Sequence, residues 1–101
     1  MEPEHPLVQY QYGTLLRESG RTAEAEEALS NAVRIKPDFS EAAVGLAEII
    51  VERGGHAEAE SVLVESLEAD PENYRALEIV AGLYIDQGQP DKAIRLLEKQ
   101  N

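Results

Sequence analysis

Residues 20–26 read GRTAEAE and residues 54–60 read GGHAEAE, so a glycine and the string AEAE return after 34 residues. Other positions keep the same step along the chain. The columns that hold one residue type are Gly20, Gly54 and Gly88; Ala25, Ala59 and Ala93; Leu29, Leu63 and Leu97; and Pro37 and Pro71. Because many independent columns agree on one period, the sequence predicts an internal repeat.

Each repeat is predicted to be a pair of helices. Tyr12, Leu15 and Leu16 follow the spacing of one helix face, and the same rhythm returns one repeat later. Small residues in the columns of Gly13 and Ala25 would let the two helices approach closely. No strand pattern competes. The predicted helices span residues 5–18, 22–35, 40–53, 57–69, 73–86 and 90–100.

The residues between these segments are typical of helix ends. Gly20 and its two equivalents follow apolar segments, where a left-handed residue ends a helix without a Cβ penalty. Thr22 is predicted to cap the second helix, and Pro90 to lie in the first turn of the last. Asp38 and Glu41 have capping-box spacing at the start of the third helix.

A 34-residue helical hairpin with small residues at these places and a closing proline resembles the tetratricopeptide repeat (TPR). The resemblance covers nearly the whole chain and implies an all-α fold, a right-handed superhelix (solenoid) of three TPR-like hairpins. A single domain would span residues 1–101, with repeats at about 6–39, 40–73 and 74–101, the last truncated. The sequence departs from the family pattern at Gln9, Ala43 and Leu77, where an aromatic residue is usual.

The composition limits the partners of the chain. Its 20 acidic and 9 basic side chains give a net charge of −11, which argues against nucleic acid because such a surface repels phosphate. No segment approaches the ~20 apolar residues of a membrane span, and the N-terminus lacks the apolar core of a secretory signal. We expect no membrane insertion. A cytoplasmic location is expected, although no pattern in the sequence determines the compartment.

The sequence offers no support for catalysis. It contains no cysteine, His5 and His56 lie 51 residues apart, and neither an HExxH motif nor a phosphate-binding loop is present. Paired carboxylates such as Glu26 and Glu27 fall in the first turns of second helices, where negative charge complements the helix dipole. We therefore predict that the chain is not an enzyme and uses no metal and no cofactor.

In the TPR family the first helix of each pair lines the concave face, so the resemblance implies a groove. The groove residues so implied are Tyr10, Thr14, Arg17, Val44, Glu48, Val51, Glu52, Arg75, Glu78, Ile79, Ile85 and Asp86. Aliphatic side chains among carboxylates suit a protein or peptide partner with basic and apolar side chains. Alternatively, Val51, Ile79 and Ile85 serve packing between repeats. The clamp that holds acidic chaperone tails is rejected, because among its positions only Arg75 has the right chemistry.

The function that follows is a protein–protein interaction module with a scaffold or adaptor role. The alternatives are a self-associating assembly element and a regulatory TPR segment of a larger protein or enzyme. The last predicted helix carries Ile94, Leu96 and Leu97 with no later hairpin to cover all of them, which makes this face a candidate homodimer surface. We expect a two-fold dimer there. The alternative is a monomer in which Ile94 and Leu97 turn back onto the third hairpin and leave Leu96 exposed.

Overall fold

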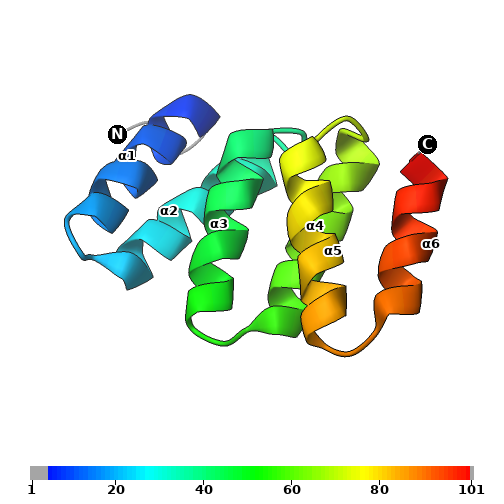
Figure 1. The fold of residues 1–101 in the computed structure, drawn as a ribbon. Coiled ribbons are helices and arrows are strands. Elements are labelled where there is room, and N and C mark those ends of the chain that lie inside the picture. The colour runs from blue at the N-terminus through cyan, green and yellow to red at the C-terminus, as the bar shows by residue number, and fades with distance from the viewer. Residues whose placement is uncertain (1–4, 101) are drawn as a thin grey trace.

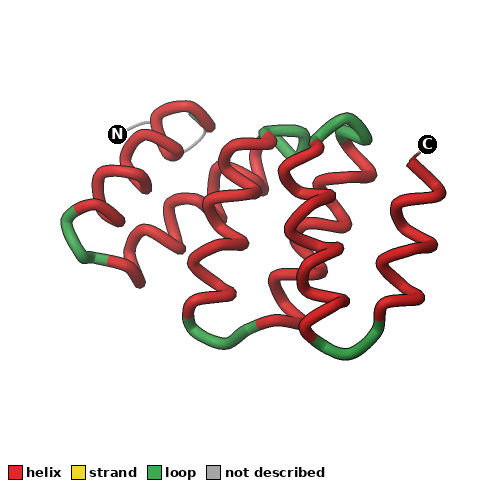
Figure 2. Tube along the Cα trace, in the orientation of Figure 1, coloured by secondary structure: helices red, strands yellow, loops and turns green. Residues whose placement is uncertain are grey.

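The computed structural model describes residues 5–100 of the chain. This part contains six helices and no strand (Figures 1 and 2), which confirms the all-α prediction. Every predicted helix is present, with ends within one residue of those expected. The helices are α1 (Pro6–Glu18), α2 (Thr22–Ile35), α3 (Ser40–Glu52), α4 (His56–Ala69), α5 (Tyr74–Asp86) and α6 (Pro90–Gln100).

The helices form a row of three antiparallel hairpins. Each helix packs mainly against the helices next to it in sequence, and α3 also touches α5 (Figure 1). The described part is elongated, with principal extents of 43 × 24 × 16 Å. A row of hairpins that contact only their neighbours is a solenoid, so the predicted fold class is confirmed.

The repeated columns have the structural roles expected of them. Gly20, Gly54 and Gly88 have φ values of 82°, 86° and 72°, and each lies in the turn between the helices of one hairpin. The alanine column is buried in all three hairpins. A Cβ built on Gly13 would lie 2.8 Å from Cγ of Leu29, so α1 and α2 approach too closely there for any side chain.

Two predicted caps are wrong. Thr22 is the first residue of α2 rather than its N-cap, and Arg21 at the N-cap makes no side-chain cap. Asp38 lies one residue before the N-cap Phe39, and its carboxylate accepts a hydrogen bond from Lys36 Nζ at 3.0 Å instead. A side-chain cap is found at α5, where Asn73 Oδ1 accepts from the backbone N–H of Ala76 at 3.2 Å.

Candidate functional site

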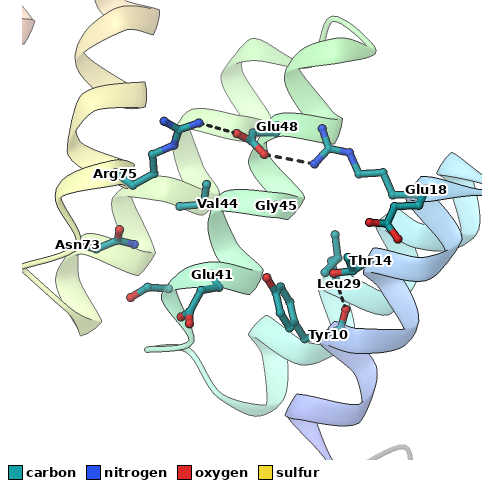
Figure 3. A pocket seen from close by; sticks show the side chains of 12 residues that line it. Tyr10, Thr14, Glu18, Leu29, Glu41, Val44, Gly45, Glu48, Asn73 and Arg75 are labelled. Atoms are coloured by element: carbon teal, nitrogen blue, oxygen red, sulfur yellow. Dashed lines mark hydrogen bonds and ion pairs between the residues drawn. The ribbon is translucent and has the colours of Figure 1, made fainter.

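A groove runs along the face that the first helices of the hairpins share. Its main pocket has a volume of about 710 Å³ (Figure 3). Most of the lining comes from α1 and α3, with one side chain from α2 and one wall from the start of α5. The lining residues are Tyr10, Thr14, Arg17, Glu18, Leu29, Ser40, Glu41, Val44, Gly45, Glu48, Asn73 and Arg75.

The floor of this pocket is apolar because Gly45 leaves α3 without a side chain at its centre. A Cβ placed on Gly45 would lie 3.5 Å from Cδ1 of Leu29, so this α2 side chain reaches the pocket past the α3 backbone. Val44 lies beside it. Tyr10 lines the α1 side, and its ring centroid is 5.1 Å from that of Phe39, which holds the ring in place.

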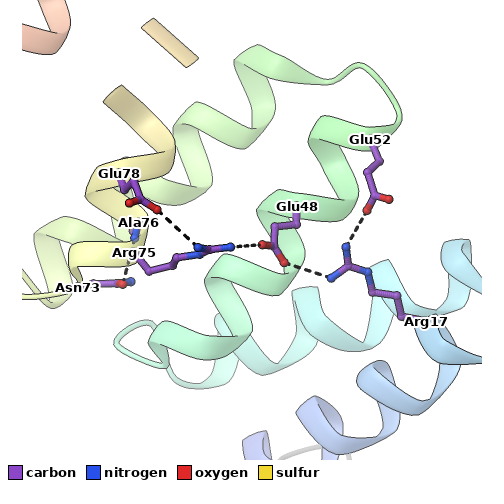
Figure 4. A network of polar contacts seen from close by, with 7 residues as sticks. All are labelled: Arg17, Glu48, Glu52, Asn73, Arg75, Ala76 and Glu78. Carbon is purple, nitrogen blue, oxygen red and sulfur yellow. Dashed lines mark hydrogen bonds and ion pairs between the residues drawn. The ribbon is translucent and has the colours of Figure 1, made fainter. Parts of the chain in front are cut away.

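A chain of ion pairs crosses the groove from one repeat to the next (Figure 4). The carboxylate of Glu48 on α3 accepts from Arg17 Nη1 of α1 at 3.2 Å and from Arg75 Nη2 of α5 at 3.0 Å. Arg17 Nη2 also donates to Glu52 at 2.7 Å, and Arg75 Nη1 to Glu78 at 3.5 Å. Burial lowers the pKa of Arg17, but its bonds to the two glutamates outweigh burial and leave the pKa raised. This network of ion pairs therefore links all three hairpins.

Several polar groups at the pocket edge already have hydrogen-bond partners. Thr14 Oγ1 donates to the Tyr10 carbonyl at 3.0 Å, and Ser40 Oγ donates to Asp70 Oδ2 at 2.7 Å. Asn73 caps α5 through its oxygen and donates from Nδ2 to Ser66 Oγ at 3.2 Å, in a buried position. These bonds fix the side chains before any ligand arrives, which lowers the entropic cost of binding.

Two further carboxylates line the pocket from opposite sides. Glu18 stands at the end of α1 and Glu41 in the first turn of α3; both are exposed (Figure 3). Within the described residues, neither takes part in an ion pair. With two arginines and three glutamates in its lining, the pocket has a formal charge of −1. A positively charged group of a ligand would therefore pair with Glu18 or Glu41.

A smaller pocket of about 300 Å³ continues the groove toward the C-terminal end of α3. Its apolar walls are Val51 of α3 and Ile79 of α5. The ion-pair network forms the rest of its lining, through Arg17, Glu48 and Glu52. The two pockets therefore lie on either side of the Arg17–Glu48 pair.

Neither a metal site nor a membrane-spanning helix is found in the described part of the chain. Within it, no group of three or more His, Asp and Glu side chains is placed to hold a metal ion. Among the described helices, none combines the length and apolar character needed to cross a membrane.

The family model of the tetratricopeptide repeat matches residues 16–77 and again residues 51–101. Together the two matches cover the chain from residue 16 to its end. The chain belongs to the tetratricopeptide repeat family. Membership supports a protein-interaction module, and nothing in the described residues indicates catalysis.

Similar proteins agree with the TPR assignment. The peroxisomal targeting signal receptor of Saccharomyces cerevisiae is 34% identical over 91 residues, which are 89% of this chain and 15% of the receptor. The crystal structure of MamA superposes with a TM-score of 0.85 at 19% identity, over 98% of this chain and 58% of MamA. YrrB, a TPR protein with an unusual peptide-binding site, gives 0.80 at 18% identity, over 98% of this chain and 51% of YrrB. The chain thus spans only part of each.

Most of the groove residues that the TPR resemblance implied lie together in the structure. Nine line one or both pockets: Tyr10, Thr14, Arg17, Val44, Glu48, Val51, Glu52, Arg75 and Ile79. Glu78 joins them through its ion pair with Arg75. Ile85 and Asp86 are exposed near the end of α5 and line neither pocket. Val51 and Ile79 are also packed against the core, so the packing role considered for them is real.

Sequence reasoning missed the residues that give the pocket its shape. Leu29 was identified only as a column of the repeat, and the gap that Gly45 leaves in α3, through which Leu29 reaches the groove, was not predicted. The signal was present, because Gly45 lies inside a helix where glycine is unfavourable. Glu18, Ser40, Glu41 and Asn73 were not included either, since they stand at helix ends, where a helical-face argument is weakest.

The predicted acidic character of the groove needs correction. Glu48, Glu52 and Glu78 were expected to present their charges to a partner, but all three bind arginines of the same chain. Glu78 pairs with Arg75 three residues before it in α5, a spacing that a single helix reveals. For Glu48 the reason is the register between repeats, which places Arg17 and Arg75 on either side of it. Such positions lie 31 and 27 residues apart, and spacing within one helix does not reveal them.

The prediction for the C-terminal face is also partly wrong. Leu96 is half-buried and packs against the core, whereas Ile94 and Leu97 are exposed. This is the reverse of the arrangement considered for a monomer. Leu96 is equivalent to Ala28 and faces its own hairpin, while Leu97 occupies the outer column.

Proposed function

We propose that this TPR chain binds a peptide segment of a partner protein in the groove along α1, α3 and α5. The segment would place an apolar side chain in the main pocket and basic side chains beside it. The observation that carries the proposal is the pocket over Gly45, which joins an apolar floor to a charged rim. The chain would act as a scaffold or adaptor, and catalysis has no part in the proposal.

The apolar anchor follows from the shape of the floor. Leu29, Val44 and Tyr10 offer carbon surface at the bottom of a pocket whose polar edge is already hydrogen-bonded. When an aliphatic or aromatic side chain enters the pocket, the polar groups at the edge keep their hydrogen bonds within the chain. The apolar surfaces of the side chain and of the floor are removed from water, which favours binding. At the position of Gly45, the other repeats carry Gln11 and Ile79. The gap that exposes Leu29 to the groove is therefore found only where the middle repeat has Gly45.

The basic flanks follow from the charges that remain after internal pairing. Glu48 is satisfied by two guanidinium groups and gains little from a further cation. Glu18 and Glu41, on the other hand, line the same pocket as exposed carboxylates. A Lys or Arg on either side of the anchor would meet one of them. The overall charge of −11 would favour the approach of such a peptide at low salt.

Selection from a random peptide library displayed on phage tests the proposal. We expect recovered sequences to combine an apolar residue with Lys or Arg, and their affinity to fall as salt rises. Gly45→Leu fills the pocket and should weaken a selected peptide at least tenfold. Gly82→Leu is the matched control, because a Cβ on Gly82 of α5 meets nothing within 4 Å and this residue lines neither pocket.

The controls separate a blocked pocket from an unfolded protein. Both substitutions replace a helical glycine, so both variants should melt at or above the temperature of the native chain. Equal binding by Gly45→Leu and Gly82→Leu would place the contact surface elsewhere, and a library that yields no binder would contradict the proposal.

Two other functions were considered from the sequence. Self-association rests on an observation of its own and is treated below. A regulatory segment of a larger protein is compatible with a chain that spans part of its relatives, and its groove would bind in the same way. A cytoplasmic location stays a prediction.

A further inference from the structure

The outer face of α1 exposes side chains that are buried at the same place in the other hairpins. Leu15 is 62% exposed, whereas its equivalents Ile49 and Leu83 are 1% and 4% exposed. Tyr12 is exposed too, although its equivalents in α3 and α5 are buried. Because α3 and α5 each pack against the second helix of the preceding hairpin, which α1 lacks among the described residues, we infer that this row faces that helix. Within the described residues, no helix covers it on α1.

The outer face of α6 shows the same contrast from the other side. Leu97 is 43% exposed, whereas its equivalents Leu29 and Leu63 are 2% and 0% exposed. Leu29 owes its burial to contact with both its own hairpin at Gly13 and the next hairpin at Gly45. Leu97 has an own-hairpin neighbour in α5, but no described helix follows α6.

These two faces are the two halves of one interface. The chain makes that interface twice internally, between α2 and α3 and between α4 and α5. The row of Tyr12 and Leu15 is the half that a first helix contributes, and Leu97 belongs to the half that a second helix contributes. The outer faces therefore have matching shapes by construction, because each repeats a surface that already packs against the other kind.

The polar positions of the interface are matched as well. Inside the chain, Glu26 of a second helix accepts from Arg53 Nε at the end of the next first helix at 2.9 Å. The third repeat has Ile94 in place of Glu26, and the first repeat has Ser19 in place of Arg53. At the outer faces, both positions of this ion pair are therefore occupied by uncharged residues. An interface between these faces would leave no unpaired charge at this position, where one buried without a partner would oppose association.

We propose that copies of this chain associate head to tail, with α6 of one copy packed against α1 of the next in the register of the internal interfaces. This goes beyond groove binding and replaces the two-fold dimer expected from the sequence. A two-fold contact would pair α6 with α6, and the chain contains no such pairing to continue. A heterologous contact leaves one face free at each end, so association is open-ended.

Sedimentation of the full chain over a range from about 10 µM to about 1 mM tests the proposal, because a contact made by one hairpin face of each copy should associate weakly. The native chain should show a weight-average mass that rises steadily with concentration. Leu15→Glu blocks the α1 face and Leu97→Glu blocks the α6 face, so each variant alone should sediment as a monomer. Ser30→Glu adds the same charge at an exposed position of α2 outside both faces and should behave as the native chain.

Mixing the two blocked variants gives the decisive result. Leu15→Glu retains a sound α6 face and Leu97→Glu a sound α1 face, so an equimolar mixture should form a one-to-one complex and nothing larger. A native chain that stays monomeric throughout overturns the proposal, as does a mixture that stays monomeric. Association by Leu15→Glu alone would show a two-fold α6 contact instead, and association by Leu97→Glu alone an α1 contact.

Measurements of folding and of peptide binding on the two variants are controls that do not depend on association. Leu15 is 62% and Leu97 43% exposed, so both variants should keep the native circular dichroism spectrum and melt close to the native chain. Neither residue lines a groove pocket, so peptide affinity should be unchanged in both variants. Failure of head-to-tail association would therefore leave the groove proposal standing, and the reverse also holds.

Discussion

Leu29 contacts glycines of two hairpins, and the two contacts differ in the room they leave. A Cβ on Gly13 would lie 2.8 Å from Leu29 Cγ and 3.4 Å from the Ala25 carbonyl, whereas one on Gly45 would lie 3.5 Å from Leu29 Cδ1. The first distance is a clash with a buried side chain that has little freedom to move. The second is ordinary van der Waals contact.

The same substitution should therefore have opposite effects at the two glycines. Gly13→Ala should lower the free energy of unfolding by about 1 kcal/mol, since overpacking exceeds the gain in helix propensity. Gly45→Ala should raise it by about 0.5–1 kcal/mol through propensity alone. Urea denaturation of both variants measures the difference. Stabilisation by Gly13→Ala would show that the α1–α2 contact is looser than described.

For single residues, the sequence predicted which positions repeat better than it predicted which groups each side chain bonds to. The glycine turns and the close contact at Gly13 follow from columns that repeat, because the same backbone geometry recurs in every hairpin. The caps do not follow in this way. Asp38 had the right type and spacing, but its carboxylate binds Lys36, and the N-cap of α3 is Phe39.

At the scale of elements, Arg53 joins three helices. It follows the end of α3, its Nε and Nη2 donate to the carboxylate of Glu26 on α2 at 2.9 Å, and Nη2 also donates to Glu58 on α4 at 2.8 Å. The hydrogen bonds from Arg53 lower the pKa of Glu26 below its ordinary 4.5. A carboxyl group with a depressed pKa in the folded state stabilises the fold above its unfolded value, and that stability is lost as pH falls through the folded value.

Removal of Arg53 should therefore matter at neutral pH and cease to matter in acid. Arg53→Met should lower the melting temperature at neutral pH, and the gap to the native chain should close as pH falls below 4.5 and through the folded pKa of Glu26. Arg34→Met is the control for net charge, since Arg34 makes no ion pair within the described residues. A gap that is constant with pH would assign the loss to packing of the Arg53 stem.

Helix positions were predicted within one residue, because apolar rhythm and turn residues are local signals. The pairing of charges between helices was not predicted. Glu48 and Glu52 looked available from their own helix alone, and only the stacking of hairpins brings Arg17 and Arg75 to Glu48 and Arg17 to Glu52. The same stacking brings Leu29 beneath Gly45.

At the scale of the whole molecule, one kind of interface accounts for both the fold and its outer faces. Repetition made the solenoid predictable, since each hairpin contacts its neighbours in the same register. The stacking of hairpins also gives the groove and the two end faces different roles. The groove carries an apolar pocket with a charged rim, whereas the ends carry Leu15 and Leu97 in the columns that join hairpins.

The central claim is that ligands bind in the groove, and amide chemical shifts of the isotope-labelled chain test it most directly. A selected peptide titrated into the chain should shift the amide signals of Thr14 on α1, Gly45 on α3 and Arg75 on α5, which come from three different hairpins and line one pocket. Signals of Ser30 and Glu65, exposed on α2 and α4, should stay in place. Shifts confined to those outer helices, with the three pocket signals unmoved, would contradict the account.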